Sequence, residues 1–226
     1  MKIKIKNIIF DVDNTIVKNE EEDKLEYKKV LKKYGYDESL YNDIYRSIGN
    51  YDCDFTRENI YYNLKDMTDF VNKELDTDFQ VEFMEEIIEV IGSKFCREAL
   101  VTKETLEYLI NKGYNLYVFS NFYSRIQKER IKNLSLDKYF IRVFGSDEIG
   151  AKPFKEAFDN LLKEIGATKD ECIMIGDDKR TDISGANRVG MKAILLDIDG
   201  TRDLKQAEDA KDYIVIKDLK ELENIF

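Results

Sequence analysis

Short apolar runs recur along this chain and are separated by segments with helical spacing. The runs are Ile8–Val12, Leu116–Ser120, Cys172–Ile175 and Ala193–Leu196. They are continuous rather than alternating, which is typical of parallel strands buried on both faces. A more mixed run, Phe140–Ser146, is also predicted to be a strand.

Helical patterns lie between these runs. They are Thr102–Asn111, which ends before Gly113; Arg125–Leu134; the stretch "PFKEAFDNLLKEIG", which begins at Pro153; and Ile183–Val189, which is followed by Gly190. Glycine commonly follows the end of a helix, and proline suits its first turn. The alternation of strands and helices predicts an α/β fold with a doubly wound parallel sheet.

The segment from Lys18 to Glu98 breaks this alternation and contains no convincing buried strand. It shows long stretches with helical spacing, such as Leu25–Tyr34, Arg57–Leu75 and Val81–Phe95. We therefore expect a smaller all-helical domain, residues 18–98, inserted into a core formed by residues 1–17 and 99–226.

Charge narrows the classes of partner. The net charge is −10, which argues against nucleic acid, because binding to its backbone depends on Lys and Arg. Residues 18–98 carry most of the imbalance, with 12 Lys or Arg against 21 Asp or Glu. We interpret this as solvated helix faces that mildly disfavour polyanionic substrates.

The cellular location is predicted from the lack of membrane-spanning and signal-peptide patterns. No apolar run approaches the ~20 residues of a membrane span, and "MKIKIKNIIF" lacks the apolar region of a signal peptide. Cys53, Cys96 and Cys172 form no pair at metal-ligand spacing, and Cys172 is expected in the core. We expect a cytoplasmic protein without a membrane partner, either a monomer or a weak homodimer.

The chain has no histidine, so acid/base catalysis or metal binding would depend on carboxylates, hydroxyls and lysine. Ligands bind at the carboxyl ends of the strands in an open parallel sheet. Polar residues follow the predicted strands or open the next helix: Asp11, Asp13, Ser120, Asn121, Lys152, Asp177, Asp178 and Asp182. Converging carboxylates raise one another's pKa, which a divalent cation and a lysine would relieve, and hard oxygen ligands favour Mg²⁺.

Four motifs in this order resemble those of the haloacid dehalogenase superfamily, in its phosphatase branch. The motifs are "DVDNT", "VFSN", "AKP" and "GDDKRTDISGA". The resemblance covers the core without the insert, and the insert stands where the family places a cap over the site. Asn14 and Phe154 depart from the residues common in the family, but neither touches the expected chemistry.

The resemblance implies a role for each motif residue. Asp11 would be the nucleophile and a Mg²⁺ ligand, and Asp13 the general acid/base, with its backbone carbonyl also on the metal. Ser120 would hydrogen-bond the phosphoryl group, and Lys152 would offset negative charge. Asp177 would bind Mg²⁺.

Supporting roles follow from the same resemblance. Asp182 would lie in the second shell or orient Lys152, and Asp178 is an alternative metal ligand. Thr15 and Asn121 would support the loops or touch phosphate.

These roles imply a Mg²⁺-dependent phosphatase that hydrolyses a small phosphorylated metabolite through an aspartyl-phosphate. Asp13 favours phosphoryl transfer, because the family's dehalogenases lack an acid at this position. A phosphomutase similar to β-phosphoglucomutase is the alternative. A receiver that stores phosphate on Asp without turnover is a more distant one.

Some residues are expected to play structural roles. "DIDGT" repeats the local pattern of "DVDNT", but no further motif follows it, so Asp197 and Asp199 are interpreted as turn residues near the rim of the site, with Gly200 in an unusual conformation. Five tyrosines of the insert are predicted to pack helices: Tyr27, Tyr34, Tyr45, Tyr61 and Tyr62. Substrate anions could be held by one of four arginines, each expected at the surface: Arg46, Arg57, Arg97 and, with the best claim, Arg125.

Overall fold

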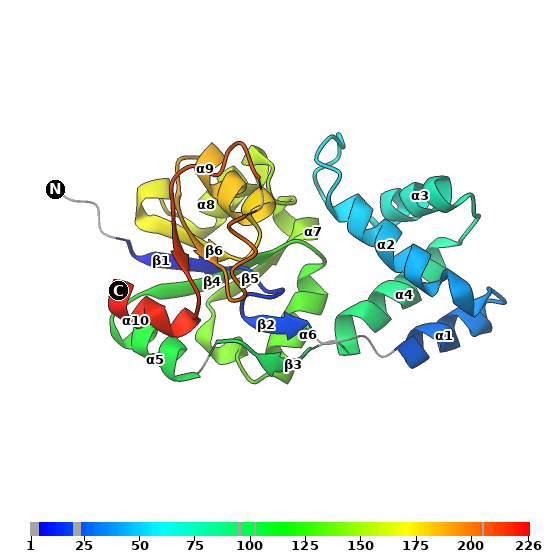
Figure 1. Ribbon diagram of the computed structural model, residues 1–226, viewed down its shortest axis with the longest axis horizontal. Coiled ribbons are helices and arrows are strands. Elements are labelled where there is room, and N and C mark those ends of the chain that lie inside the picture. The colour runs from blue at the N-terminus through cyan, green and yellow to red at the C-terminus, as the bar shows by residue number, and fades with distance from the viewer. Residues whose placement is uncertain (1–4, 20–23, 95, 102, 205) are drawn as a thin grey trace.

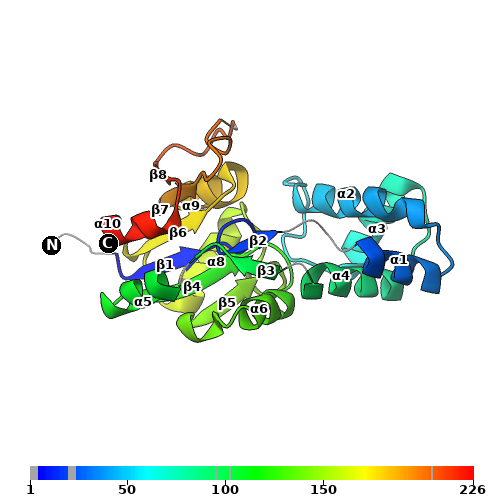
Figure 2. The same ribbon diagram turned by 60° about the horizontal axis from the view of Figure 1, so that its bottom comes forward.

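The computed structural model describes residues 5–19, 24–94, 96–101, 103–204 and 206–226. Its centre is a sheet of six parallel strands in the order β5-β4-β1-β6-β7-β8 (Figure 1; β7 and β8 are labelled in Figure 2). The strands are β1 (Asn7–Phe10), β4 (Asn115–Ser120), β5 (Arg142–Gly145), β6 (Cys172–Gly176), β7 (Lys192–Leu196) and β8 (Tyr213–Ile216). The predicted doubly wound α/β core is confirmed.

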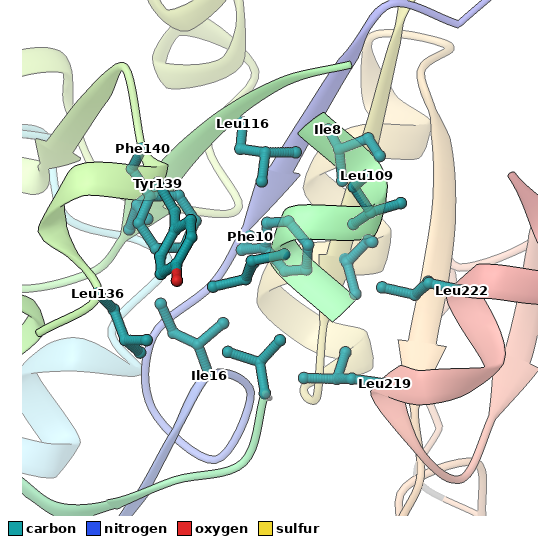
Figure 3. Packing of buried hydrophobic residues seen from close by; sticks show 14 of the residues in the cluster. Ile8, Phe10, Ile16, Leu109, Leu116, Leu136, Tyr139, Phe140, Leu219 and Leu222 are labelled. Carbon is teal, nitrogen blue, oxygen red and sulfur yellow. The ribbon is translucent and has the colours of Figure 1, made fainter. Parts of the chain in front are cut away.

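Helices cover both faces of this sheet. They are α5 (Lys103–Asn111), α6 (Ser124–Asn133), α7 (Ser146–Ile149), α8 (Lys155–Ile165), α9 (Ser184–Arg188) and α10 (Leu222–Ile225). Successive residues of a strand point to opposite faces. Ile8 and Phe10 therefore pack with Leu109 and Leu222, as Figure 3 shows, whereas Ile9 packs on the other face with residues of α8 and α9.

A separate helical unit lies beyond one end of the sheet (Figure 2). It consists of α1 (Lys24–Lys33), α2 (Tyr41–Asp52), α3 (Leu64–Leu75) and α4 (Val81–Lys94), with a single 3₁₀ turn at Glu38–Leu40. We call this unit the cap. Its apolar side chains, among them Leu31, Ile44, Val71 and Phe83, form a second centre of hydrophobic packing, which Phe122 and Ile126 of the core also join.

The connections between cap and core form a small antiparallel ribbon. Val17–Asn19 (β2) pairs with Cys96–Ala99 (β3). The boundaries expected from the sequence, 17/18 and 98/99, fall inside this ribbon. None of the helices in the described ranges is long and apolar enough to cross a membrane.

Several element predictions were wrong. The last strand, β8, was missed because it is an edge strand in which Ile214 and Val215 remain exposed. The stretch Arg57–Leu75 is not one helix: α3 begins only at Leu64, where the Asn63 side chain accepts hydrogen bonds from the next backbone amides. Pro153 lies before α8 rather than in its first turn.

Two further predictions involve residues at the edge of the described ranges. Thr102 and Phe95, the expected ends of two helices, lie outside the described residues. The sequence predicted a helix from Ile183 to Val189. Helix α9 is shorter, and it follows a π-helical turn, Lys179–Ile183.

Cys172 is fully buried, as predicted, and burial raises the pKa of its thiol to about 11.

Candidate active site

The carboxyl ends of β1, β4 and β6 face helix α2 of the cap across a cavity of about 350 Å³. Eight of the sequence-predicted residues line it: Asp11, Asp13, Ser120, Asn121, Lys152, Asp177, Asp178 and Asp182. The order of the sheet reverses at β1, and this is where an open α/β sheet forms a binding crevice. The topology therefore brings together residues that are up to 171 positions apart in the chain.

Lys152 is buried and contacts two carboxylates. Its Nζ lies 2.7 Å from Asp11 Oδ1 and 2.6 Å from Asp182 Oδ1, and the residue is only 2% exposed. Burial alone would lower the pKa of Lys152, but the two adjacent carboxylates raise it above its usual value. Lys152 is therefore a fixed positive charge between two acids.

Asp11, Asp177 and Asp182 bring one carboxylate oxygen each to within 4.8 Å of one another. Burial raises the pKa of Asp11, although Lys152 opposes the shift and Asp13 adds to it. Burial raises the pKa of Asp177 to about 8, and the negative charges of Asp11 and Asp182 add to this shift. Arg202 opposes the shift, because its Nη1 lies 3.1 Å from Asp177 Oδ2. A divalent cation would remove this repulsion, and the all-oxygen donor set fits Mg²⁺.

The backbone at the end of β6 leaves room for this cluster. A Cβ atom on Gly176 would lie 2.2 Å from the carboxyl group of Asp182, so only glycine fits there. Asp182 comes from the π-helical turn and accepts a hydrogen bond from the Asp178 amide at 3.1 Å. Asp178 itself pairs with Arg180 at 2.8 Å rather than joining the three carboxylates.

Asp13 is held by two residues of α6 that the sequence analysis did not single out. Arg130 donates to both carboxylate oxygens, with Nη2–Oδ1 2.7 Å and Nη1–Oδ2 3.1 Å. Gln127 Nε2 lies 3.2 Å from Asp13 Oδ2 and 3.0 Å from Ser120 Oγ. The sequence did contain a feature that could have pointed to them: directly after the Ser120 loop, a Gln and an Arg lie three positions apart and so share a helix face.

Asn121 and Thr15 bond to the catalytic candidates and their loops. Asn121 Oδ1 accepts from the Lys152 amide at 2.8 Å, and its Nδ2 donates to the Lys152 carbonyl at 3.0 Å. Thr15 Oγ1 donates to Asp11 Oδ2 at 3.4 Å. Asn14, which stands between the two motif residues Asp13 and Thr15, has a φ of 55°, a left-handed conformation that Asn tolerates.

Helix α2 supplies the cap wall of the cavity, through Tyr45, Ile48, Gly49 and Asp52. Tyr45 is 47% exposed and lines the cavity, so its expected role in helix packing was wrong, whereas Tyr27 and Tyr62 are buried as predicted. The other two of the five tyrosines, Tyr34 and Tyr61, are less buried. The Tyr34 hydroxyl donates a hydrogen bond to Glu86, and the Tyr61 hydroxyl accepts one from Asn160.

Asp52 has an enclosed Oδ1 atom without a hydrogen-bond partner. Burial raises the pKa of Asp52 to about 7, although Arg57 opposes the shift. An unpartnered buried acceptor is costly, so this atom marks a place where a donor is missing.

The arginines considered as anion ligands lie elsewhere. Arg125 pairs with Glu89 and Arg46 with Asp43. Arg57 stacks over the Tyr51 ring and donates to the Tyr51 carbonyl at 2.9 Å. The side chain of Arg97 lies outside the described residues. Arg130, Arg180 and Arg202 line the cavity instead.

The second acidic motif forms a turn, as predicted. Asp199 Oδ1 accepts from the Thr201 amide at 2.9 Å, Asp197 Oδ1 accepts from the Arg202 amide at 2.7 Å, and Gly200 has a φ of 76°. This turn also places Arg202 beside Asp177 at the rim of the cavity.

Known proteins resemble this chain in sequence. Residues 8–196 match the sequence model of the haloacid dehalogenase-like hydrolases. A glyceraldehyde 3-phosphate phosphatase of Pyrococcus furiosus is 29% identical over 84% of this chain and 80% of that protein. The chain spans only about half the length of the first relatives at 34% identity; for the ribulose-1,5-bisphosphate 5-phosphatase of Halopiger xanaduensis, 47% of this chain and 45% of that protein are covered.

A solved structure resembles the whole chain. The crystal structure of a HAD phosphatase from Thermococcus onnurineus superposes with a TM-score of 0.65 at 25% identity and covers 98% of this chain and 97% of that one. The family match extends over both the acidic motif at Asp11 and the loop at Asp177. The chain therefore belongs to the haloacid dehalogenase-like hydrolases.

Proposed function

We propose that this protein is a Mg²⁺-dependent phosphatase that hydrolyses a small phosphomonoester through an aspartyl-phosphate on Asp11. The observation that carries the proposal is the buried Lys152, which contacts Asp11 and Asp182 at the same cavity that Asp13 and Ser120 line. The similarity to a glyceraldehyde 3-phosphate phosphatase supports phosphoryl chemistry.

In the first step, a carboxylate oxygen of Asp11 attacks phosphorus and the bond from phosphorus to the leaving oxygen breaks. Asp13 gives its proton to that leaving oxygen. Lys152 offsets the negative charge on Asp11 and on the phosphoryl oxygens, and Ser120 Oγ lies at the cavity where it can donate to them.

In the second step, Asp13 takes a proton from a water molecule that attacks phosphorus. The bond between Asp11 and phosphorus breaks, which restores the Asp11 carboxylate and releases inorganic phosphate. Asp11 and Asp177, with the backbone carbonyl of Asp13, would hold Mg²⁺, while Asp182 fixes Lys152. When bound, Mg²⁺ supplies positive charge for the phosphoryl oxygens.

A screen of sugar phosphates, nucleotides, phosphorylated acids and p-nitrophenyl phosphate with Mg²⁺ tests this function. We expect phosphate release from p-nitrophenyl phosphate and from a subset of the natural esters. Formation of an isomeric sugar phosphate without phosphate release would instead identify a phosphomutase. A stable phosphoprotein without turnover would identify a receiver, and an inactive protein would refute the phosphatase.

A further inference from the structure

The cations of the cavity are already engaged by carboxylates. Among the described residues that line it, each Lys or Arg has an acidic partner: Arg130 with Asp13, Lys152 with Asp11 and Asp182, Arg180 with Asp178, and Arg202 with Asp177. A leaving group with its own negative charge would compete with these carboxylates for the same cations. A neutral leaving group would leave all of them intact.

The cap wall offers an acceptor instead of a cation. Asp52 lies at the last residue of α2, and its enclosed Oδ1 has no hydrogen-bond partner. Ile48 and Gly49 lie beside it on the same wall and offer no side-chain donor. Asp52 lines the cavity, so its carboxylate can accept a hydrogen bond from a hydroxyl of a bound substrate, whereas a substrate carboxylate would meet repulsion from it.

We propose that Asp52 accepts a hydrogen bond from a hydroxyl of the leaving group, so that the substrates are phosphate esters of small neutral polyols or sugars. This inference rests on the proposed phosphatase function. It assigns recognition of the alcohol to α2, while the core residues bind the phosphoryl group.

Glycerol 3-phosphate and 3-phosphoglycerate form a matched pair for the test, because a hydroxymethyl group in one replaces the carboxylate of the other. Both are measured as substrates and as competitive inhibitors of p-nitrophenyl phosphate hydrolysis. We expect the protein to prefer glycerol 3-phosphate by about 10-fold or more, since its hydroxymethyl group can donate to Asp52 and the carboxylate that replaces it cannot. Asp52→Ala should bring the ratio close to one, mainly through KM, and Asp52→Asn should preserve part of it.

Asp43→Asn is the control, because Asp43 lies on the same helix but is exposed and pairs with Arg46. It should leave the ratio unchanged. Three outcomes would overturn the role of Asp52. They are a preference for 3-phosphoglycerate, no binding of either ester, and an unchanged ratio of the two esters in Asp52→Ala. Failure to hydrolyse p-nitrophenyl phosphate would count against the phosphatase function itself.

A separate feature, on α6, fixes the orientation of Asp13. The buried Arg130 grips both oxygens of Asp13, and its Nη1 also donates to Gln127 Oε1 at 2.9 Å. Gln127 in turn contacts Ser120 and Asp13. The side chain of Asp13 is 35% exposed, so these two α6 residues, rather than enclosure, determine where its carboxyl group lies.

We infer that Arg130 is a positioning residue, which holds Asp13 within reach of the leaving oxygen. This second inference also rests on the proposed function, but its observation is independent of Asp52. Proton transfer requires the donor at hydrogen-bond distance, and it contributes about 10²–10⁴-fold to rate. An alkoxide depends on this proton, whereas p-nitrophenolate is stable enough to leave without it.

The test compares kcat/KM for p-nitrophenyl phosphate and for the best alkyl phosphate of the screen. We expect Arg130→Met to lose at least about 10-fold more activity on the alkyl ester, as part of the contribution of general acid catalysis. Arg130→Lys should fall in between, because an ammonium cannot bind both oxygens in parallel. Lys132→Met, an exposed position on the same helix, should not change the ratio.

The ratio of the two kcat/KM values does not depend on how much of a variant is folded. Equal losses on both esters in Arg130→Met would therefore overturn the positioning role. Hydrolysis of neither ester by the unmodified protein would refute the proposed function instead.

Discussion

At the residue scale, one lysine determines the charge balance of the site. Lys152 donates to Asp11 Oδ1 at 2.7 Å, whereas the hydrogen bond that the Thr15 side chain donates to Asp11 Oδ2 is longer, at 3.4 Å. Side chains therefore hold the two oxygens of Asp11 unequally, and Oδ2 accepts the longer of the two hydrogen bonds. This asymmetry suits a carboxylate that must use one oxygen as a nucleophile and keep the other anchored.

The two acidic motifs should respond differently to the same substitution. Asp11→Asn removes the proposed nucleophile, and we expect kcat for p-nitrophenyl phosphate to fall by at least about 10³-fold. Asp199→Asn changes a residue that bonds to Thr201 within an exposed turn, so most activity should remain. Steady-state kinetics of both purified variants checks this, and the reverse order would mean that the wrong copy was assigned to catalysis.

At the element scale, the close approach of α8 and α9 positions the acidic turn after β6. A Cβ on Gly185 of α9 would lie 2.1 Å from Cε2 of Phe158 on α8. Phe158 is fully buried and also packs edge-on against Phe119 of β4, 5.3 Å between ring centroids. The ring therefore cannot move aside, and the helix that follows Asp182 depends on a glycine.

Two glycine substitutions should have opposite effects on stability. Gly185→Ala should lower the free energy of unfolding by about 1–3 kcal/mol, because the added methyl group overpacks against Phe158. Gly49→Ala is the matched control, since a Cβ there meets no atom within 4 Å and Gly49 lies within α2. It should raise the free energy of unfolding by about 0.5–1 kcal/mol. Urea unfolding measures both, and equal signs would contradict the packing described.

At the scale of the whole molecule, the site gathers more buried negative charge than positive charge. Asp177 carries a pKa of about 8 in the folded protein, against an ordinary value of 3.8. Between these values the folded protein holds a proton that the unfolded chain has released. The metal-free protein should therefore lose stability as pH rises from about 4 to about 8.

Mg²⁺ should reverse this trend because it replaces the proton. We expect Mg²⁺ at 100 times its Kd to raise the free energy of unfolding by about 2.7 kcal/mol at pH 8.5. The gain should shrink towards pH 5, where protons compete for Asp177. Thermal unfolding with EDTA or with Mg²⁺ at both pH values measures this, with Asp199→Asn as the control; an equal shift at both pH values would contradict it.

Sequence periodicity succeeded where burial is complete and failed where it is partial. The strands β1, β4, β6 and β7 are buried on both faces and so appear as apolar runs. Edge strand β8 is half exposed and was missed for that reason. Helix α2 was not singled out within the predicted helical insert, although Tyr41, Ile44, Ile48 and Tyr51 form a buried stripe at helical spacing. Helix-like spacing also continued through residues 57–63, where Asn63 capping sets the true start of α3.

The sequence by itself determined the α/β core, the helical insert and the acids, hydroxyl and lysine that the sheet collects, because these depend on local periodicity and on the rule that strand ends share an edge. Only the tertiary structure decided which side chains touch. The hydrogen bonds of Arg130 and Gln127 to Asp13 and the contact of Arg202 with Asp177 join segments that are distant in sequence, and the Asp52 oxygen is left without a partner by the way its surroundings pack. No local pattern encodes such contacts, because they arise from how packed helices and loops orient their side chains across the cavity.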